Sequence, residues 1–475
     1  MDTVIFHLTE HGALLPTGKV LMWGFRGDTA PMIWDPATNT ARRIPGPDSQ
    51  NVIFHAGTIG LPDGRLAMIG GVLANNVDVA HDVPRTYDPV APAGRSPWGI
   101  LGGHLLTPRF YPTTVPLATG QILVASGDYV STPGLPPSQG RSAEIYDPAQ
   151  NKWVPVVDQS APNKRLMSVD VFPTMYQLPS GKIIYLPEAD DFSGRGAAPA
   201  LLDLDGPRVT SDVFGPITVD GQTVAAPSTT RGWQPIPLAL DRRPQGGSVL
   251  LVDDTGATPT TRILAVGGSL FSAELIDVTD ELHPTVARSE LTFNRDDHAG
   301  VVALPDGSVL VLDGSAQSPL PPELFRNGRW TQAGPTPLFK RDHHGTAVLV
   351  PDGRIICGAD EAGSGLEVFS PDYVASRARP AITASPATAR AGTTITLTAS
   401  VAPTKVASVS LIRAATISHA TNPGNRFVKL AVTRTNGALS VRIPIATIAP
   451  PGDYLLFVVD DKGIPSVGKF LRVQL

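Results

Sequence analysis

Histidine placement is the first feature of this 475-residue chain that could carry chemistry. A four-residue turn motif recurs along the chain. One position, seven residues before the second residue of each copy, can be compared among all copies. That position is occupied by Thr9, His55, Tyr111, Phe172, His298 and His344. Three of the ten histidines therefore share one register, and His343 is adjacent to one of them. Neutral imidazole is the commonest metal ligand, so a fold that gathered these side chains would create a metal centre.

The phrase itself indicates the fold. It consists of leucine or valine, then proline (once alanine), a variable residue and glycine, and its copies begin at Leu15, Leu61, Leu117, Leu178, Leu304 and Val350. Such a sequence suits a tight turn between two strands. An aromatic residue before an Asp-Pro turn follows several copies, as in Trp34-Asp35-Pro36 and Tyr87-Asp88-Pro89. The spacing resembles that of kelch blades, whose period is about 50 residues.

Six clear copies, and a seventh unit without the phrase between residues 231 and 280, predict an all-β, seven-bladed, kelch-like β-propeller. A propeller gathers its inner strands around a central channel. The shared position begins each inner strand, so the residues of that register are expected to meet at one end of the channel.

From about Pro380 the phrase disappears, and short alternating segments such as Thr394–Ala399 and Leu439–Ile443 take over. This pattern is typical of a β-sandwich. We therefore expect a propeller over residues 1–376 and an Ig-like sandwich over 377–475.

Composition restricts the class of partner. A net charge of −5 without a stripe of Lys or Arg argues against a nucleic-acid ligand. No apolar run reaches the roughly 20 residues of a membrane helix, and the single cysteine, Cys357, permits no intramolecular disulfide. The N-terminal segment lacks the pattern of a secretory signal, which favours a cytoplasmic protein, although a chain whose signal had been removed would look the same. We expect a monomer.

The histidine register has two interpretations. The imidazoles could simply hydrogen-bond neighbouring blades and line a wet channel, or they could bind a metal. The clustering favours the metal. Imidazole suits Cu, Zn, Fe and Ni alike, so the ligand type alone does not select the ion.

Several longer stretches resemble the galactose oxidase/glyoxal oxidase family over essentially the whole chain. They are Phe54-His55-Ala56-Gly57, Arg109-Phe110-Tyr111-Pro112, Arg341-Asp342-His343-His344-Gly345, the region Ser410–Arg426, and Pro450–Ser466. The resemblance implies one copper ion in the channel, with Tyr111 as the equatorial tyrosine and with His344 and His419 as the histidine ligands. It also implies that His419 lies on a loop of the C-terminal domain that enters the propeller pore.

Two departures from the family's pattern bear on the chemistry. The cysteine that the family cross-links to its tyrosine is replaced by His55, and the axial tyrosine that acts as a base is replaced by His343. Without the thioether, the family's two-electron alcohol oxidation lacks its store of one oxidising equivalent. Imidazole at position 343 could still act as the base. The predicted metal set is thus Tyr111, His55, His343, His344 and His419.

Two neighbouring features could tune this set. Arginine and aspartate residues precede two of the channel histidines, as Arg341-Asp342 and as Arg295-Asp296-Asp297. These residues could form ion pairs between blades. They could instead hydrogen-bond to ligand imidazoles or act as an acid or base near the substrate. Asp342, with His343 and Tyr111, is therefore a predicted catalytic residue.

Tyr129 stands where the family has a tryptophan stacked on its cofactor. It could shield the cofactor together with His55, or simply pack against its neighbours.

Three functions follow. The leading one is a mononuclear metal enzyme, with copper preferred over Zn, Fe or Ni, that oxidises a small organic substrate, with O2 as candidate co-substrate, in a biosynthetic route. A covalent His55–Tyr111 link could replace the thioether. The alternatives are a Lewis-acid lyase, isomerase or cyclase, and a binding propeller with a degenerate site.

Overall fold

The computed structural model describes the chain with gaps, and the residues it describes are 2–4, 9–24, 30–47, 51–73, 76–130, 138–140, 143–156, 173–186, 199–204, 208–209, 217–219, 222–224, 230–231, 233–241, 243, 246–268, 270–315, 317–341, 345–358, 365–419 and 421–475. Within these ranges the regular structure is strand, apart from two short 3-10 helices, η1 (Asp372–Ala375) and η2 (Pro403–Lys405). No helix in the described ranges is long and apolar enough to cross a membrane.

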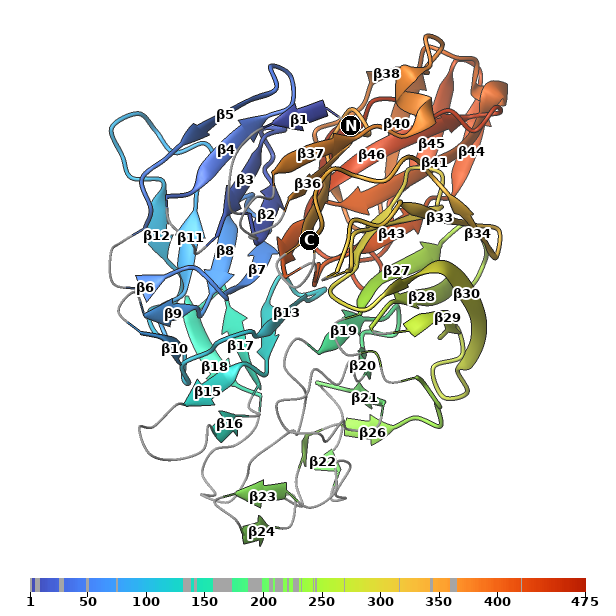
Figure 1. The fold of residues 1–475 in the computed structure, drawn as a ribbon. Coiled ribbons are helices and arrows are strands. Elements are labelled where there is room, and N and C mark those ends of the chain that lie inside the picture. Colours follow the sequence, from blue (N-terminus) through green and yellow to red (C-terminus); the bar gives the residue numbers. More distant parts are fainter. Residues whose placement is uncertain are drawn as a thin grey trace.

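The described strands form seven four-stranded blades (Figure 1). The first four blades are β2 (His11–Leu14), β3 (Val20–Trp23), β4 (Met32–Asp35), β5 (Thr40–Arg43); β7 (Gly57–Gly60), β8 (Leu66–Ile69), β11 (Arg85–Tyr87), β12 (Trp98–Ile100); β13 (Thr113–Pro116), β14 (Ile122–Ala125), β17 (Ala143–Asp147), β18 (Lys152–Pro155); and β19 (Thr174–Gln177), β20 (Ile183–Leu186), β21 (Ala200–Leu202), β26 (Trp233–Pro235).

The last three blades are β27 (Gly247–Asp253), β28 (Thr260–Val266), β29 (Leu270–Asp277), β30 (Thr285–Arg295); β31 (Gly300–Ala303), β32 (Val309–Leu312), β33 (Glu323–Arg326), β34 (Arg329–Gln332); and β35 (Thr346–Leu349), β36 (Ile355–Gly358), β37 (Leu366–Phe369), β1 (Asp2–Val4). β1 pairs antiparallel with β37, so the N-terminal strand completes the seventh blade. The predicted seven-bladed propeller is confirmed.

The recurring phrase forms the turn between the first and second strand of six blades. In the first, the amide of Gly18 donates to the carbonyl oxygen of Leu15 at 2.9 Å, and Gly18 has a φ of 82° that favours glycine. The turns at Leu61, Leu117, Leu178, Leu304 and Val350 repeat this bond. The blade without the phrase is the fifth, in which β27 and β28 form an antiparallel hairpin within the predicted range 231–280.

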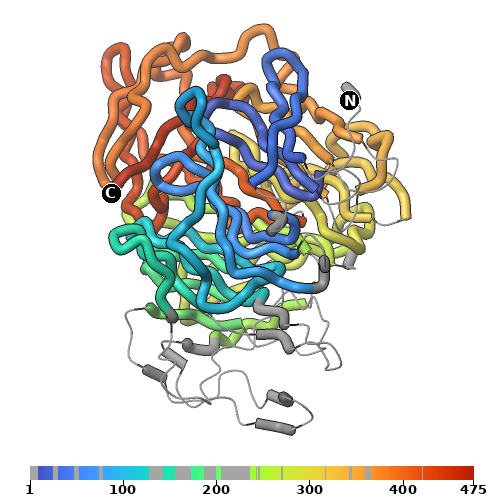
Figure 2. Tube along the Cα trace, turned by 90° about the vertical axis from the view of Figure 1, so that its left-hand side faces the viewer, coloured from blue at the N-terminus to red at the C-terminus, as the bar shows by residue number. Residues whose placement is uncertain are grey.

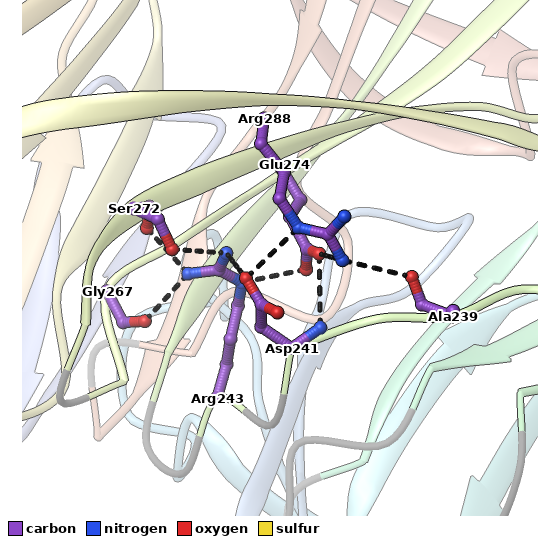
Figure 3. Close-up of polar contacts among 7 residues, drawn as sticks. All are labelled: Ala239, Asp241, Arg243, Gly267, Ser272, Glu274 and Arg288. Carbon is purple, nitrogen blue, oxygen red and sulfur yellow. Dashed lines mark hydrogen bonds and ion pairs between the residues drawn. The ribbon is translucent and has the colours of Figure 1, made fainter.

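A buried arginine fixes the start of the inner strand in four of the blades. In the fifth, Arg243 Nε donates to Glu274 Oε2 on β29 at 3.0 Å, and its Nη1 donates to the carbonyl oxygens of Gly267 and Ser272 (Figure 3). The equivalent pairs are Arg109–Glu144, Arg295–Glu323 and Arg341–Glu367. Each pair joins the segment before an inner strand to the third strand of the blade that this inner strand begins.

The strands from residue 382 onward belong to the C-terminal domain: β38 (Ile382–Ala384), β39 (Thr388–Arg390), β40 (Thr394–Ala399), β41 (Val406–Arg413), β42 (Thr416–Ser418), β43 (Arg426–Lys429), β44 (Val432–Thr435), β45 (Ala438–Arg442), β46 (Gly452–Asp460) and β47 (Lys469–Gln474). All but β42 form the two layers of the sandwich, in the strand orders β38–β40–β45–β44 and β43–β41–β46–β47–β39. The predicted strands Thr394–Ala399 and Leu439–Ile443 correspond to β40 and β45. The 3-10 helix η1 lies between β37, the last propeller strand, and β38. The domain boundary at residue 376 stays a prediction.

The sandwich and the propeller share hydrogen-bonded sheets. β43 pairs in parallel with β27, so that the sheet of the fifth blade runs on into the sandwich. β42 pairs antiparallel with β2, the inner strand of the first blade. Figure 2 shows the orange-to-red C-terminal part of the chain lying against the blue first blades. The segment between β41 and β43 therefore lies among the inner strands of the propeller.

Candidate metal centre

Three residues of the predicted site share a rare backbone conformation. His55, Tyr111 and His419 have φ values of 60°, 59° and 51°. A non-glycine residue in this region costs about 1–3 kcal/mol and persists where the surroundings fix it, often at functional sites. His55 lies just before β7, Tyr111 just before β13, and His419 just after β42. The structure thus supports these residues as a candidate site through their backbone as well as their side chains.

The side chains of these three residues meet. Tyr111 Oη and His55 Nε2 are 2.8 Å apart, and the amide of Tyr111 donates to the carbonyl oxygen of His55 at 3.0 Å. The ring of His419 lies 4.6 Å from that of Tyr111 and 5.0 Å from that of His55, centroid to centroid. All three residues are buried, and His419 is fully so. The shared register of His55 and Tyr111 therefore does place them side by side.

The backbone at Tyr111 depends on a close approach by a glycine. Gly127 has a φ of 74°, and a Cβ there would lie 2.6 Å from the carbonyl oxygen of Phe110. The ring centroid of Phe110 lies 4.7 Å from that of His55, and the ring centroid of Phe54 lies 6.4 Å from that of His419. These aromatic rings give the imidazoles and the phenol a largely apolar wall.

His419 reaches the pore from the C-terminal part of the chain, as the sequence predicts. β42 pairs with β2 so that Ser418 lies opposite His11, and the amide of His419 donates to the carbonyl oxygen of Glu10 at 3.3 Å. Thr416 Oγ1 donates to the carbonyl oxygen of Thr58 in the second blade. His419 Nδ1 lies 2.9 Å from Ser418 Oγ, and this contact orients the ring.

Two residues that the sequence analysis missed complete the cluster. Glu10 Oε1 lies 2.6 Å from His419 Nε2, 3.1 Å from His11 Nε2 and 3.9 Å from His55 Nε2. Both Glu10 and His11 are fully buried. The ligand atoms of Glu10, His11 and His419 all lie within 4.8 Å of one another, which is a spacing that a metal ion can bridge.

His11 is held as a neutral imidazole. Its ring stacks on Trp23 at a centroid distance of 4.8 Å, and its Nε2 accepts the backbone N–H of His55 at 3.2 Å. Burial lowers its pKa to about 3. Glu10 and His11 directly follow Thr9, which occupies the shared position in the first blade. This adjacency is the sequence signal that could have pointed to them.

The other predicted site residues have different outcomes. Asp342, His343 and His344 lie outside the described residues, and so does Phe172. Tyr129 lies in β15 (Asp128–Val130), of which only the backbone is described. The metal and catalytic roles assigned to these residues stay predictions.

The arginine–aspartate phrases mostly join residues as ion pairs. Arg341 Nη1 donates to Asp313 Oδ1 at 2.8 Å, which links the sixth and seventh blades as predicted. Arg295, the last residue of β30 in the fifth blade, pairs with Glu323 on β33 of the sixth blade. Asp297 Oδ1 lies 2.7 Å from Nδ1 of His298, whose ring is 6.3 Å from that of His419. This contact is the one that fits a carboxylate orienting a channel imidazole.

Cys357 lies in a different blade from Tyr111. It lies in β36 opposite Ala347, fully buried, and the charged groups that act on its thiol are Asp313, Arg341 and Glu367. Burial raises the pKa of this thiol well above its usual value. The hydroxyl of Tyr111 instead lies 2.8 Å from Nε2 of His55.

Comparisons with known proteins agree with this architecture. The family model described as "Galactose oxidase-like, Early set domain" matches residues 379–473. The aldehyde oxidase GLOX of Vitis pseudoreticulata is 26% identical over 87% of this chain and 80% of its own length. A galactose oxidase of Gibberella zeae is 24% identical over 97% of this chain and 68% of its own.

A solved structure shares the fold over the full length. It is a fungal alcohol oxidase of the AA5 family in complex with copper, with a TM-score of 0.77, 22% identity, and coverage of 100% of this chain and 99% of that one. This likeness concerns the fold. The curated relatives are oxidases by name, and the family model places a galactose oxidase-like early set domain at residues 379–473, so the chain is similar to galactose and glyoxal oxidase-like proteins.

Proposed function

We propose that this protein is a mononuclear copper enzyme that carries out an O2-linked oxidation of a small organic substrate, without a Tyr–Cys cofactor. One observation carries the proposal. His55, Tyr111 and His419 come from two blades and the C-terminal domain, adopt strained backbone conformations, and bring their side chains together in a buried cluster. The names of the relatives as aldehyde, galactose and alcohol oxidases support an alcohol or aldehyde as the substrate class.

The residues present fit a metal. The cluster combines imidazole nitrogens, a phenol oxygen and a carboxylate oxygen, and among the divalent first-row metals Cu2+ has the highest affinity for such donors. His419 and Tyr111 would hold the ion, with His55 and Glu10 adjoining them, and His344 and His343 are further predicted ligands. Bound copper would supply one-electron redox chemistry and polarise a bound oxygen atom.

The chain's own residues prepare the site in three ways. Ser418 fixes the ring orientation of His419 through Nδ1. His55 contacts the hydroxyl of Tyr111, so it can hold or take that proton. The rings of Phe54 and Phe110 restrict water near these groups.

The absence of a thioether separates this proposal from the chemistry of the relatives. Cys357 is the chain's single cysteine and lies in β36, while His55 occupies the cysteine's position in the family pattern. The second oxidising equivalent must therefore be handled without a Tyr–Cys group. A His55–Tyr111 covalent link stays a proposal, and peptide mapping that recovers two separate unmodified peptides would exclude it.

A Lewis-acid function is the second candidate. The mixed carboxylate and imidazole donors around Glu10 also suit Zn2+, which carries no redox chemistry. Full turnover with zinc in the absence of O2 would favour this candidate over the oxidase. A cytoplasmic, biosynthetic setting likewise stays a proposal.

The test measures metal content and O2 consumption on purified protein loaded with copper, with a panel of small alcohols and aldehydes. We expect bound copper at one ion per chain and substrate-dependent O2 consumption. His419→Ala should lose both. His283→Ala is the matched control, because His283 is exposed and pairs with Asp280 in the fifth blade. Wild-type protein that binds copper but consumes no O2 with any substrate would contradict the oxidase.

A further inference from the structure

Glu10 occupies an unusual position for a buried carboxylate. Its Oε1 atom lies within 4 Å of three imidazole nitrogens, the Nε2 atoms of His419, His11 and His55 at 2.6, 3.1 and 3.9 Å. These residues come from the first blade, the second blade and the loop after β42. The fold therefore converges on this oxygen from three directions.

The contact with His419 has the features of a ligand pair. Ser418 Oγ engages Nδ1 of the ring, so that Nε2 faces Glu10. Metal-binding histidines almost always have their second nitrogen held by a hydrogen-bonding partner, and the contact with Ser418 holds the plane of the His419 ring. His419 is thus prepared to donate through Nε2 toward the position that Glu10 also faces.

The contact between Glu10 and His11 requires a proton or a metal ion between the two groups. His11 Nε2 accepts the N–H of His55, so this nitrogen presents a lone pair rather than a proton. Glu10 Oε1, an acceptor when ionised, lies only 3.1 Å away. Two acceptors at this distance repel each other unless a proton or a metal ion lies between them. Because the hydrogen bond from His55 competes for the same lone pair, His11 is the weaker donor of the set.

We propose that Glu10 is a ligand of the metal centre, so that the site is a carboxylate–imidazole centre built from Glu10 and His419, with His11 as a weaker third donor and Tyr111 beside it. The ligand atoms of Glu10, His11 and His419 lie within 4.8 Å of one another, and two imidazoles with one carboxylate form a set known to hold divalent metals with open positions. The inference rests on the proposed metal centre and adds an anionic ligand to it.

The experiment titrates metal-free protein with Co2+, followed by visible absorption, and with Cu2+, followed by EPR. Wild type is compared with Glu10→Gln, Glu10→Asp and the control Glu290→Gln, whose carboxylate is exposed on β30. Glu10→Gln should weaken metal binding at least about tenfold and alter both spectra, since even the loss of an outer-shell partner costs 10–100-fold. Glu10→Asp should fall between Gln and wild type, and Glu290→Gln should match wild type.

The metal-induced rise in Tm is measured for each variant against its own metal-free form, which cancels the effect of the substitution on folding. A smaller rise for Glu10→Gln supports ligation. Equal affinity and identical spectra for Glu10→Gln and wild type would overturn the inference while leaving the proposed metal centre intact. Wild type that takes up no metal would overturn the centre itself. If Glu10→Gln does not fold, wild-type spectra for Glu10→Asp would overturn the inference.

Discussion

Buried carboxylates have two kinds of surroundings in this molecule. Glu274 faces the guanidinium of Arg243, and the same pairing recurs in three other blades (Figure 3). Glu10, equally buried, instead faces the imidazoles of His11, His55 and His419. The two kinds of carboxylate are similar in burial and differ in the chemistry of their neighbours.

This difference separates what holds the fold from what performs chemistry. A guanidinium is always charged and matches a carboxylate with several donors, so the arginine pairs satisfy their own charges. Imidazoles are neutral donors or acceptors that can be shared with a metal. The arginine pairs should therefore control stability, and the imidazole cluster should control metal binding. Substitutions in the arginine pairs and in the imidazole cluster should therefore affect different measured properties.

The largest expected effect comes from breaking an arginine pair. Glu323→Ala leaves the buried guanidinium of Arg295 without its carboxylate, and such a loss costs about 3–5 kcal/mol of unfolding free energy. Urea unfolding measures it. In the protein that folds, metal content should equal that of wild type. The double variant Arg295→Met/Glu323→Leu should recover most of the stability. If Glu323→Ala lost less than about 1 kcal/mol of unfolding free energy, the ion pair would not be what stabilises the blade.

Removal of His419 should produce the next largest effect. His419→Ala deletes the side chain that the C-terminal domain contributes to the pore, and we expect turnover to fall about 100-fold or more, since a catalytic metal is worth several kcal/mol. Metal analysis and O2 consumption measure the change. Unfolding should be affected less than in Glu323→Ala. Stoichiometric copper in His419→Ala would exclude this residue as a ligand.

Loss of the Tyr111 hydroxyl should have a smaller effect. Tyr111→Phe removes the contact between Tyr111 Oη and His55 Nε2 and with it the phenol oxygen proposed as a metal donor. One such hydrogen bond is worth about 0.5–1.5 kcal/mol, so turnover should fall at least about tenfold, but less than in His419→Ala because the other proposed ligands remain. Steady-state kinetics and the visible spectrum of the copper-loaded protein measure it. An unchanged spectrum would place the phenol outside the coordination sphere.

The smallest expected effect lies far from the pore, where Lys429 on β43 donates to Asp253 on β27 at 3.1 Å. Burial raises the pKa of Asp253, but hydrogen bonds from Thr255 and Lys429 outweigh it and leave the pKa lowered from 3.8. A lowered carboxyl pKa stabilises the fold above the unfolded value and loses that effect as the pH falls below 3.8.

Asp253→Asn should therefore cost at most about 1 kcal/mol at neutral pH, because the pair is partly exposed and screened by salt. Urea unfolding at several pH values is the measurement. The difference in unfolding free energy between Asp253→Asn and wild type should shrink in acid. A difference that grew in acid would contradict a lowered pKa of Asp253.

Sequence patterns predicted the fold more completely than the site. The turn phrase predicted six blades because proline and glycine fix local dihedrals at each copy, and His55 and Tyr111 were found because they share its register. His419 was found only through resemblance, since its position depends on β42 pairing with β2 across more than 400 residues. Glu10 and His11 were missed because the first copy begins with a threonine, and nothing local shows that a carboxylate will face His419.

We propose that propeller residues and His419 form one metal centre in the pore. Anomalous X-ray diffraction at the copper absorption edge, on crystals of copper-loaded protein, tests it most directly. We predict one strong peak bounded by Tyr111, His419 and Glu10. No peak in the pore, or a peak remote from these side chains, would contradict the account.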